Sequence, residues 1–148
     1  MAANRSFEEI YKDAEYVVED GKRRFVIRVG ETSGELDALL GEYQCETWAF
    51  ISAHNPRSEE LTPEENEARH IDFISYLNDH RYFAGFGQSP DGLWTPEASL
   101  LIIGIERSEA VGIGIRFEQN AILAGRKGFP PELVWCVGES KTTRPAID

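Results

Sequence analysis

At 148 residues, with 41% hydrophobic and 28% charged residues, the chain has the size and composition of one soluble globular domain. The formal net charge of −11 argues against tight binding to nucleic acid, because such binding needs a basic face. No apolar run approaches the roughly 20 residues that span a bilayer, and the first residues contain no apolar signal core, so we expect a cytoplasmic protein without membrane contact.

The first part of the chain predicts a helix, a β-hairpin and a second helix. The Ser-x-x-Glu pattern of a capping box opens the first helix at Ser6. An Asp-Gly dipeptide between two β-rich runs, residues 15–19 and 24–29, indicates a hairpin turn. Ser33 is a good N-cap for a helix that extends to about Tyr43 and carries three leucines on one face.

The second part predicts strands that alternate with helices. Residues 47–53 are apolar at nearly every position, as in a strand covered on both faces. A capping threonine, a proline and two glutamates at residues 62–65 predict the start of the main helix, which extends to about His80. Residues 98–105 are the most hydrophobic segment and are expected to be central in the sheet. The other expected elements are strands at 82–88, 120–124 and 132–137, a turn at 89–92 and a helix from about 108 to 118.

This order of elements predicts an α+β fold. We expect a single globular domain over residues 1–140, with a mixed, mostly antiparallel sheet packed by three to four helices. Because helices interleave with covered strands, an α/β three-layer fold is the alternative. Residues 141–148 have little apolar content to hold them on the domain, so we expect a flexible tail there.

Three polar residues, His54, Asn55 and Arg57, directly follow the strand at residues 47–53. Ligand-binding groups commonly lie at such strand ends. Arg57, together with Arg69 of the main helix, has the fork of donors that binds a carboxylate or phosphate. The alternative role of Asn55, which precedes a proline, is to form a turn. Dense glutamates around the two arginines argue against a strongly anionic ligand.

Asn66 and His70 lie at helical spacing with Phe73 and Leu77, on the helix face that is expected to pack inward. Buried polar side chains need hydrogen-bond partners. The two side chains therefore either bond to the preceding loop or bind a ligand, and both roles remain open at the level of sequence.

Glu97 opens the hydrophobic strand, where burial can raise the pKa of a carboxyl group and suit it to acid–base chemistry. Its alternative role is to pair with an arginine. Gln119 and its neighbour Asn120 offer amide donors and acceptors that suit recognition of a base, a sugar or an amide. Their alternative role is to cap the end of the preceding helix.

No familiar cofactor or metal motif is present. The chain lacks a phosphate-binding loop, a dinucleotide fingerprint and paired zinc-ligand spacings, so we predict no cofactor and no metal. A site of two histidines and one carboxylate, formed by His54, His70 and Glu97, would depend on the fold alone. Cys45 and Cys136 are expected to be buried thiols rather than a disulfide or a metal pair.

A set of motifs spread along the chain indicates a family. These are Phe-Ile-Ser-Ala-His-Asn-Pro at 50–56, Phe-Glu-Gln-Asn-Ala-Ile at 117–122, and Asn66, Gly85, Gly87 and Glu97 between them. The set resembles a family of uncharacterised bacterial proteins, domain of unknown function 3293, over about residues 11–134. The resemblance implies a small, single-domain, soluble bacterial protein and no particular activity. Glu118 stands where relatives usually carry a small residue, most often glycine.

We predict that the chain binds a small polar metabolite or nucleotide-like ligand at residues 53–57 and the start of the main helix. The expected ligand-binding residues are His54, Asn55, Arg57, Asn66, Arg69 and Gln119. Whether the domain is an enzyme is left open, and for an enzyme Glu97 or His70 would be the general base. The alternative is an interaction or regulatory module without catalytic activity. It would act as a homodimer or bind a protein partner through exposed aromatics such as Tyr82, Phe83, Phe86, Trp94 and Trp135.

Overall fold

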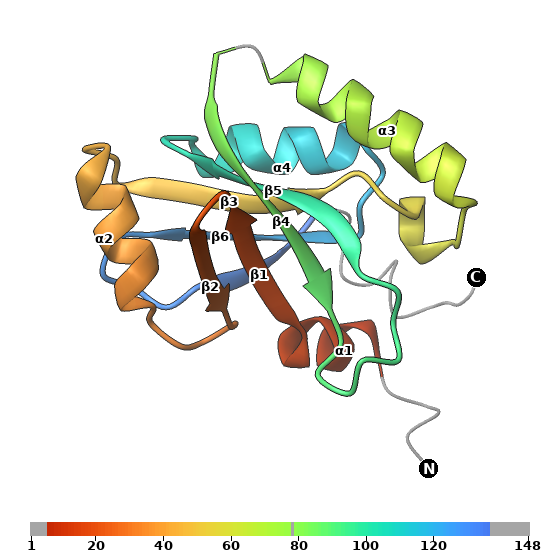
Figure 1. Cartoon of the computed structure of the whole chain (residues 1–148), viewed down its shortest axis with the longest axis horizontal. Helices are drawn as coiled ribbons and strands as arrows, with labels where there is room; N and C mark the ends of the chain where they lie inside the picture. Colours follow the sequence, from red (N-terminus) through yellow and green to blue (C-terminus); the bar gives the residue numbers. More distant parts are fainter. Residues whose placement is uncertain (1–5, 78, 137–148) are drawn as a thin grey trace.

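One antiparallel sheet forms the centre of the part of the chain that the computed structural model describes, residues 6–77 and 79–136 (Figure 1). Its seven strands are β1 (Glu15–Asp20), β2 (Arg23–Ile27), β3 (Thr47–Ser52), β4 (Arg81–Gln88), β5 (Glu97–Ile103), β6 (Ala121–Arg126) and β7 (Glu132–Trp135). The strand order is β2-β1-β4-β5-β3-β6-β7, and every neighbouring pair is antiparallel. The strand β5 is therefore central, as its hydrophobic sequence predicted.

Helices surround this sheet. In the described residues they are α1 (Phe7–Asp13), α2 (Gly34–Glu42), the short 3-10 helix η1 (Pro56–Ser58), α3 (Pro63–Tyr76) and α4 (Arg107–Arg116). Ser6, Ser33 and Thr62 each accept a hydrogen bond from the backbone N–H three residues on, so the three predicted N-caps are confirmed. None of these helices combines the length and the apolar character needed to cross a membrane. The predicted α+β fold is confirmed, with a sheet that is antiparallel throughout rather than mixed.

Several predicted boundaries were wrong at the ends of elements. The helix α3 ends at Tyr76 rather than near His80, because Leu77 leaves the helical conformation and the chain enters β4 at Arg81. The helix α4 follows Glu106 and ends before position 118. The strand predicted over 24–29 stops at residue 27. Part of the strand predicted at 132–137 and the tail predicted at 141–148 lie outside the described residues.

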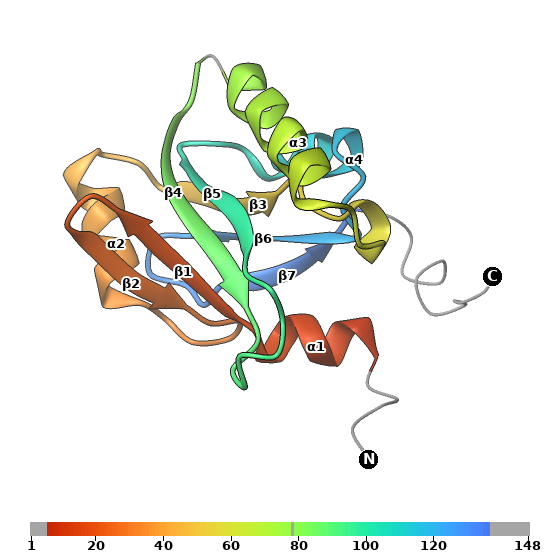
Figure 2. The same cartoon turned by 45° about the vertical axis from the view of Figure 1, so that its right-hand side comes forward.

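The sheet separates two hydrophobic cores, because alternate residues of each strand face opposite sides. On the first face, Ile51 of β3 packs in one core with Phe73 of α3 and Ile113 of α4. These two helices lie next to each other in both views (Figures 1 and 2). On the second face, Trp48 and Phe50 of β3 pack in a core with the leucines of α2.

The second face changes from large to small side chains along its central strands. Trp48 and Phe50 belong to the core under α2. Further along β3, Ser52 pairs with Ser99 of β5, and Ser99 also pairs with Gly85 of β4. This row of small residues leaves space above one end of the sheet.

Two glycines of β4 contribute to this space in different ways. Gly85 has to be glycine, because a Cβ atom there would overlap the carbonyl oxygen of Val17 and lie 3.1 Å from the ring of Phe50. Gly87 lies between Tyr16 on β1 and Glu97 on β5. A Cβ atom at Gly87 would meet only the Tyr16 ring, at an ordinary contact distance of 3.6 Å. Gly87 therefore leaves a gap that a larger side chain could fill.

The two glycines of α4 allow a test of how this helix packs. Gly112→Ala should raise the free energy of unfolding by about 0.5–1 kcal/mol, because its Cβ meets open space and alanine favours the helix. Gly114→Ala should lower it by about 1–3 kcal/mol, because its Cβ would overlap Cys136 Sγ and crowd Ile122. Urea denaturation measures both effects. Equal effects at the two positions would contradict the packing of α4 against β6.

Candidate functional site

A cavity of about 500 Å³ lies over the small residues of the second face, and we call it the sheet cavity. Its volume is within the range of small-molecule sites. The helix α1, the segment between β4 and β5, and the residues that lead into β6 contribute to its walls. The polar residues that matter most for its chemistry are Asn55, Ser58, Glu97, Ser99, Gln119 and Asn120.

Three of the eight residues predicted as the site, Asn55, Glu97 and Gln119, line the sheet cavity. They come from the end of β3, the start of β5 and the segment between α4 and β6. The described lining does not include the other five, His54, Arg57, Asn66, Arg69 and His70. These five lie behind or beside the cavity wall, and each has contacts of its own.

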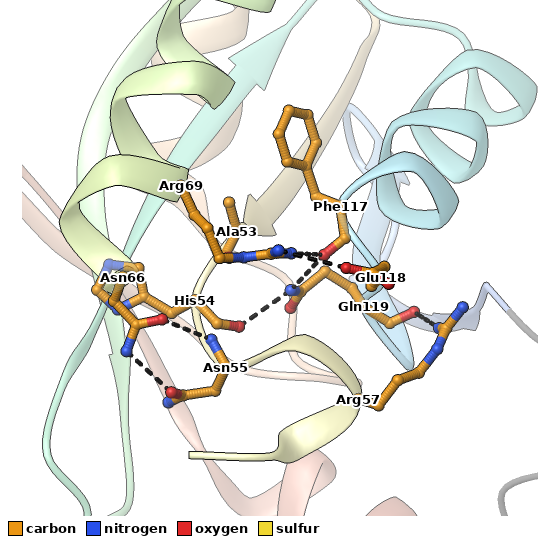
Figure 3. A network of polar contacts seen from close by, with 9 residues as sticks. All are labelled: Ala53, His54, Asn55, Arg57, Asn66, Arg69, Phe117, Glu118 and Gln119. Atoms are coloured by element: carbon orange, nitrogen blue, oxygen red, sulfur yellow. Dashed lines mark hydrogen bonds and ion pairs between the residues drawn. The ribbon is translucent and has the colours of Figure 1, made fainter. Parts of the chain in front are cut away.

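Asn55 is the centre of a polar network next to the cavity (Figure 3). Its backbone N–H donates to Asn66 Oδ1 at 2.8 Å, and its side-chain Oδ1 accepts from Asn66 Nδ2 at 2.9 Å. The same Oδ1 accepts from the backbone N–H of Leu61 at 2.9 Å. Its Nδ2 donates to Glu97 Oε2 at 2.7 Å. Asn66 therefore fixes the conformation of the loop, which is the first of its two predicted roles. Asn55 in turn orients the side chain of Glu97.

The two arginines bind backbone carbonyl groups (Figure 3). Arg69 Nε donates to the carbonyl oxygen of Ala53 at 2.6 Å, and Arg69 Nη2 donates to that of Phe117. Arg57 Nη1 donates to the carbonyl oxygen of Gln119 at 2.8 Å. These bonds join the end of β3 to the end of α4. The predicted role of the arginines as anion ligands has no support in these contacts.

Glu118 occupies a left-handed position at the end of α4. Its φ is +60°, its N–H bonds to the carbonyl of Ile115, and the N–H of Gln119 bonds to that of Gly114. This is the Schellman arrangement, in which glycine is the preferred residue. A glycine at this position would form the same turn without steric cost. Glu118 makes an ion pair with Arg69 at 3.3 Å.

Glu97 presents a carboxylate to the cavity with one oxygen engaged. Its Oε2 accepts from Asn55, and no hydrogen bond or ion pair within the described residues involves its Oε1. Burial raises the pKa of Glu97, and the hydrogen bond from Asn55 opposes this shift. The predicted alternative, a pair with an arginine, is not formed in the described part of the chain.

A second polar cluster lines the same cavity, and of its members the sequence analysis named Asn120 but missed Tyr11 and Ser58. The hydroxyl groups of Tyr11 and Ser58 are 2.7 Å apart, and Asn120 Nδ2 donates to both, at 3.1 and 3.2 Å. The hydroxyl of Tyr16 donates to the carbonyl oxygen of Tyr11. A sequence signal existed for α1 alone, where Phe7, Ile10, Tyr11 and Ala14 form a stripe at helical spacing.

His54 and His70 form a pair outside the cavity lining. Their ring centroids are 6.0 Å apart with the rings nearly perpendicular, and His54 Nε2 and His70 Nδ1 are buried without a hydrogen-bond partner. Burial lowers the pKa of both side chains; His70 lowers that of His54 further, and Glu67 partly opposes both shifts. No group of three potential ligands that could hold a metal ion occurs in residues 6–77 and 79–136. The structure thus does not assemble Glu97 with the two histidines.

Fold and site together define a small α+β domain whose antiparallel sheet carries a cavity with a polar rim. Residues 51–122 match the family model described as Protein of unknown function (DUF3293), the family that the resemblance predicted. The matched region contains Asn55, Glu97 and Gln119, the three predicted residues that line the cavity. Neither the curated proteins nor the solved structures contain a match to the chain.

The turn at Glu118 gives a test of local strain. Glu118→Gly and Glu118→Ala both remove the ion pair with Arg69, but only glycine adopts the left-handed conformation without steric cost. We expect the glycine variant to be more stable than the alanine variant by about 1 kcal/mol. Chemical denaturation of the two variants measures the difference. Equal stability would contradict the left-handed conformation at this position.

The histidine pair should make the fold sensitive to mild acid. A histidine in the unfolded chain binds a proton near pH 6.5, whereas the half-buried His54 and His70 resist protonation, so stability falls as the pH drops below 6.5. A variant with His54→Gln and His70→Gln should show a smaller loss between about pH 7.5 and 5.5. Thermal denaturation over this range tests the prediction. A parallel decline in the two proteins would show that other groups cause the acid sensitivity.

Proposed function

We propose that the protein is a cytoplasmic ligand-binding domain that holds a small polar metabolite in the sheet cavity. The observation that carries this proposal is the convergence of Asn55, Glu97 and Gln119 on one cavity from three separate parts of the chain. Such convergence of polar groups in a cavity that also has aromatic and aliphatic walls is typical of ligand sites. Side chains that only stabilise the fold would not need to face the open cavity.

The lining residues are held in place by hydrogen bonds to one another and to residues outside the lining. Asn66 orients Asn55, and Asn55 orients Glu97. Gln119 Nε2 donates to the carbonyl oxygens of His54 and Phe117, at 3.0 and 3.1 Å. No hydrogen bond within the described residues uses Gln119 Oε1. Fixed side chains with an unused acceptor are preorganised for a ligand.

Any acid–base chemistry in the cavity would depend on Glu97. It is the predicted catalytic residue that lines the cavity, and burial raises its pKa above the ordinary carboxyl value, which is the direction that suits a general acid or base. His70, the other predicted base, does not belong to the described lining. The proposal therefore assigns His70 a role in packing α3 and assigns no reaction to the domain.

The alternative function, an interaction module, has less support. Phe83, one of the aromatics expected on an exposed patch, is buried. Trp94, another of that set, is 38% exposed and lines the sheet cavity. Tyr82 is partly buried and packs against the core of the first face. Three of the five predicted aromatics are therefore buried, partly buried or part of the cavity lining, which supports the cavity rather than a surface patch as the site.

A thermal-shift screen of nucleotides, amino acids, sugars and amines tests the proposal. A ligand at a hundred times its dissociation constant stabilises the fold by about 2.7 kcal/mol, which raises Tm by several degrees. Gly87→Leu should abolish the shift, because leucine would fill the gap between Tyr16 and Glu97. Ala84→Leu, at an exposed position of the same strand, is the matched control and should retain it.

Two results would contradict a ligand site in the sheet cavity. One is a screen in which no compound raises Tm. The other is a shift that persists in a folded Gly87→Leu protein, because the ligand would then bind elsewhere on the domain.

A further inference from the structure

We infer that the ligand of the sheet cavity is an organic cation, a protonated amine attached to an aromatic or apolar body. This inference rests on the proposed function and names the chemical class of its ligand. Three features carry it: the charges in the lining, the unused oxygen of Glu97 and the aromatic walls.

The charged side chains among the described lining residues are all acidic. They are Glu97 and Glu60, and no lysine, arginine or histidine of the described residues lines the cavity. Arg57 and Arg69, the two arginines predicted to bind a ligand, donate to backbone carbonyl groups instead. A phosphate or carboxylate ligand would therefore meet two acids and no positive charge, which is unfavourable in a partly desolvated site.

Glu97 lacks the partner that a partly buried carboxylate usually has. Its Oε2 accepts from the neutral amide of Asn55, and no described residue bonds to its Oε1. Partly buried carboxylates are generally stabilised by an opposite charge or by several hydrogen bonds. An ammonium group in the cavity would supply both, since it carries a positive charge and three donors.

Aromatic rings form much of the remaining wall. Tyr16 lies across Gly87 from Glu97, and its ring meets that of Phe50 edge-on at 5.6 Å. Tyr11 and Trp94 also line the cavity. Aromatic faces attract cations and pack well against apolar or aromatic groups. The same walls would thus bind both the charged end and the body of such an amine.

The charge of the whole chain favours the same ligand class. With a net charge of −11, the domain attracts cations and repels anions over its surface. This field has no effect on which side of the domain a cation binds. Glu97 supplies that local preference, because it is the carboxylate held in place by a hydrogen bond at the cavity wall.

Three compounds of similar shape but different charge test whether the charge of the ligand determines binding. We would titrate the protein with 2-phenylethylamine, 2-phenylethanol and phenylacetate by calorimetry at neutral pH and moderate salt. The amine should bind at least about tenfold more tightly than the alcohol, and phenylacetate should bind more weakly than either. Gly87→Leu should abolish binding of all three compounds.

Two glutamine variants then locate the charge effect. Glu97→Gln keeps an acceptor for Asn55 and removes the charge, so it should reduce the preference for the amine over the alcohol about tenfold. Glu60→Gln removes the exposed acid of the lining and should leave most of that preference intact. Tm of each variant confirms that it is folded before the titrations are compared.

The outcomes distinguish failure of this inference from failure of the proposed function. If phenylacetate or the alcohol binds more tightly than the amine, and Gly87→Leu abolishes that binding, the cavity is a ligand site but the cation inference is wrong. If the two glutamine variants lose the amine preference equally, the general negative field causes it and Glu97 is not its partner. If the three compounds and the wider screen all fail to bind, the proposed function is wrong as well.

Discussion

The arrangement of the site depends on the reciprocal hydrogen bonds between Asn55 and Asn66. Asn55 has a φ of +47°, a conformation that few residue types other than glycine, asparagine and aspartate adopt readily. An aspartate at this position would place a second carboxylate against Glu97, and a glycine would have no amide to donate. Asn66 accepts from a backbone N–H through Oδ1 and donates to a side-chain oxygen through Nδ2, and a carboxamide supplies these two separate atoms. The geometry therefore determines both residue types.

This pair holds a loop that is strained along several residues. Arg57 and Ser58 also have positive φ, and Glu118 opposite them has the same left-handed conformation. The backbone N–H of Arg57 donates to the carbonyl oxygen of Glu118 at 2.7 Å, so the two strained segments support each other. Strained backbone persists where the surroundings determine it strongly, and it gathers near functional sites. Here it directs Ser58, Asn55 and Gln119 toward one cavity.

The parts of the structure that sequence analysis predicted are those governed by local contacts. Helix starts were predicted because Ser6, Ser33 and Thr62 cap by bonds that reach only three residues along the chain. The end of α3 was not predicted, because it depends on where β4 has to pair with β5. A helix end that is set by a partner strand has no local signal.

The same distinction applies to the site. Asn55, Glu97 and Gln119 were found because they stand at the ends of hydrophobic strands or next to a helix end, where polar residues are conspicuous. The contacts of Asn120 with Tyr11 and Ser58 were missed, because Ser58 and Asn120 lie 47 and 109 positions from Tyr11 in the sequence. Arg57 and Arg69 were predicted to bind an anion, because the sequence does not show that they donate to backbone carbonyl groups at the ends of β3 and α4.

Glu97 has an oxygen without a hydrogen-bond partner among the described residues, and this affects how the protein should respond to selection. Burial raises the pKa of Glu97, so folding disfavours its charged form, and the domain carries this cost at pH values above the ordinary carboxyl range. A mutant library selected only for thermal stability should therefore enrich neutral residues at position 97. A library selected in cells that need the protein should retain the acid. Positions where the two selections diverge would outline the proposed ligand site without any knowledge of the ligand.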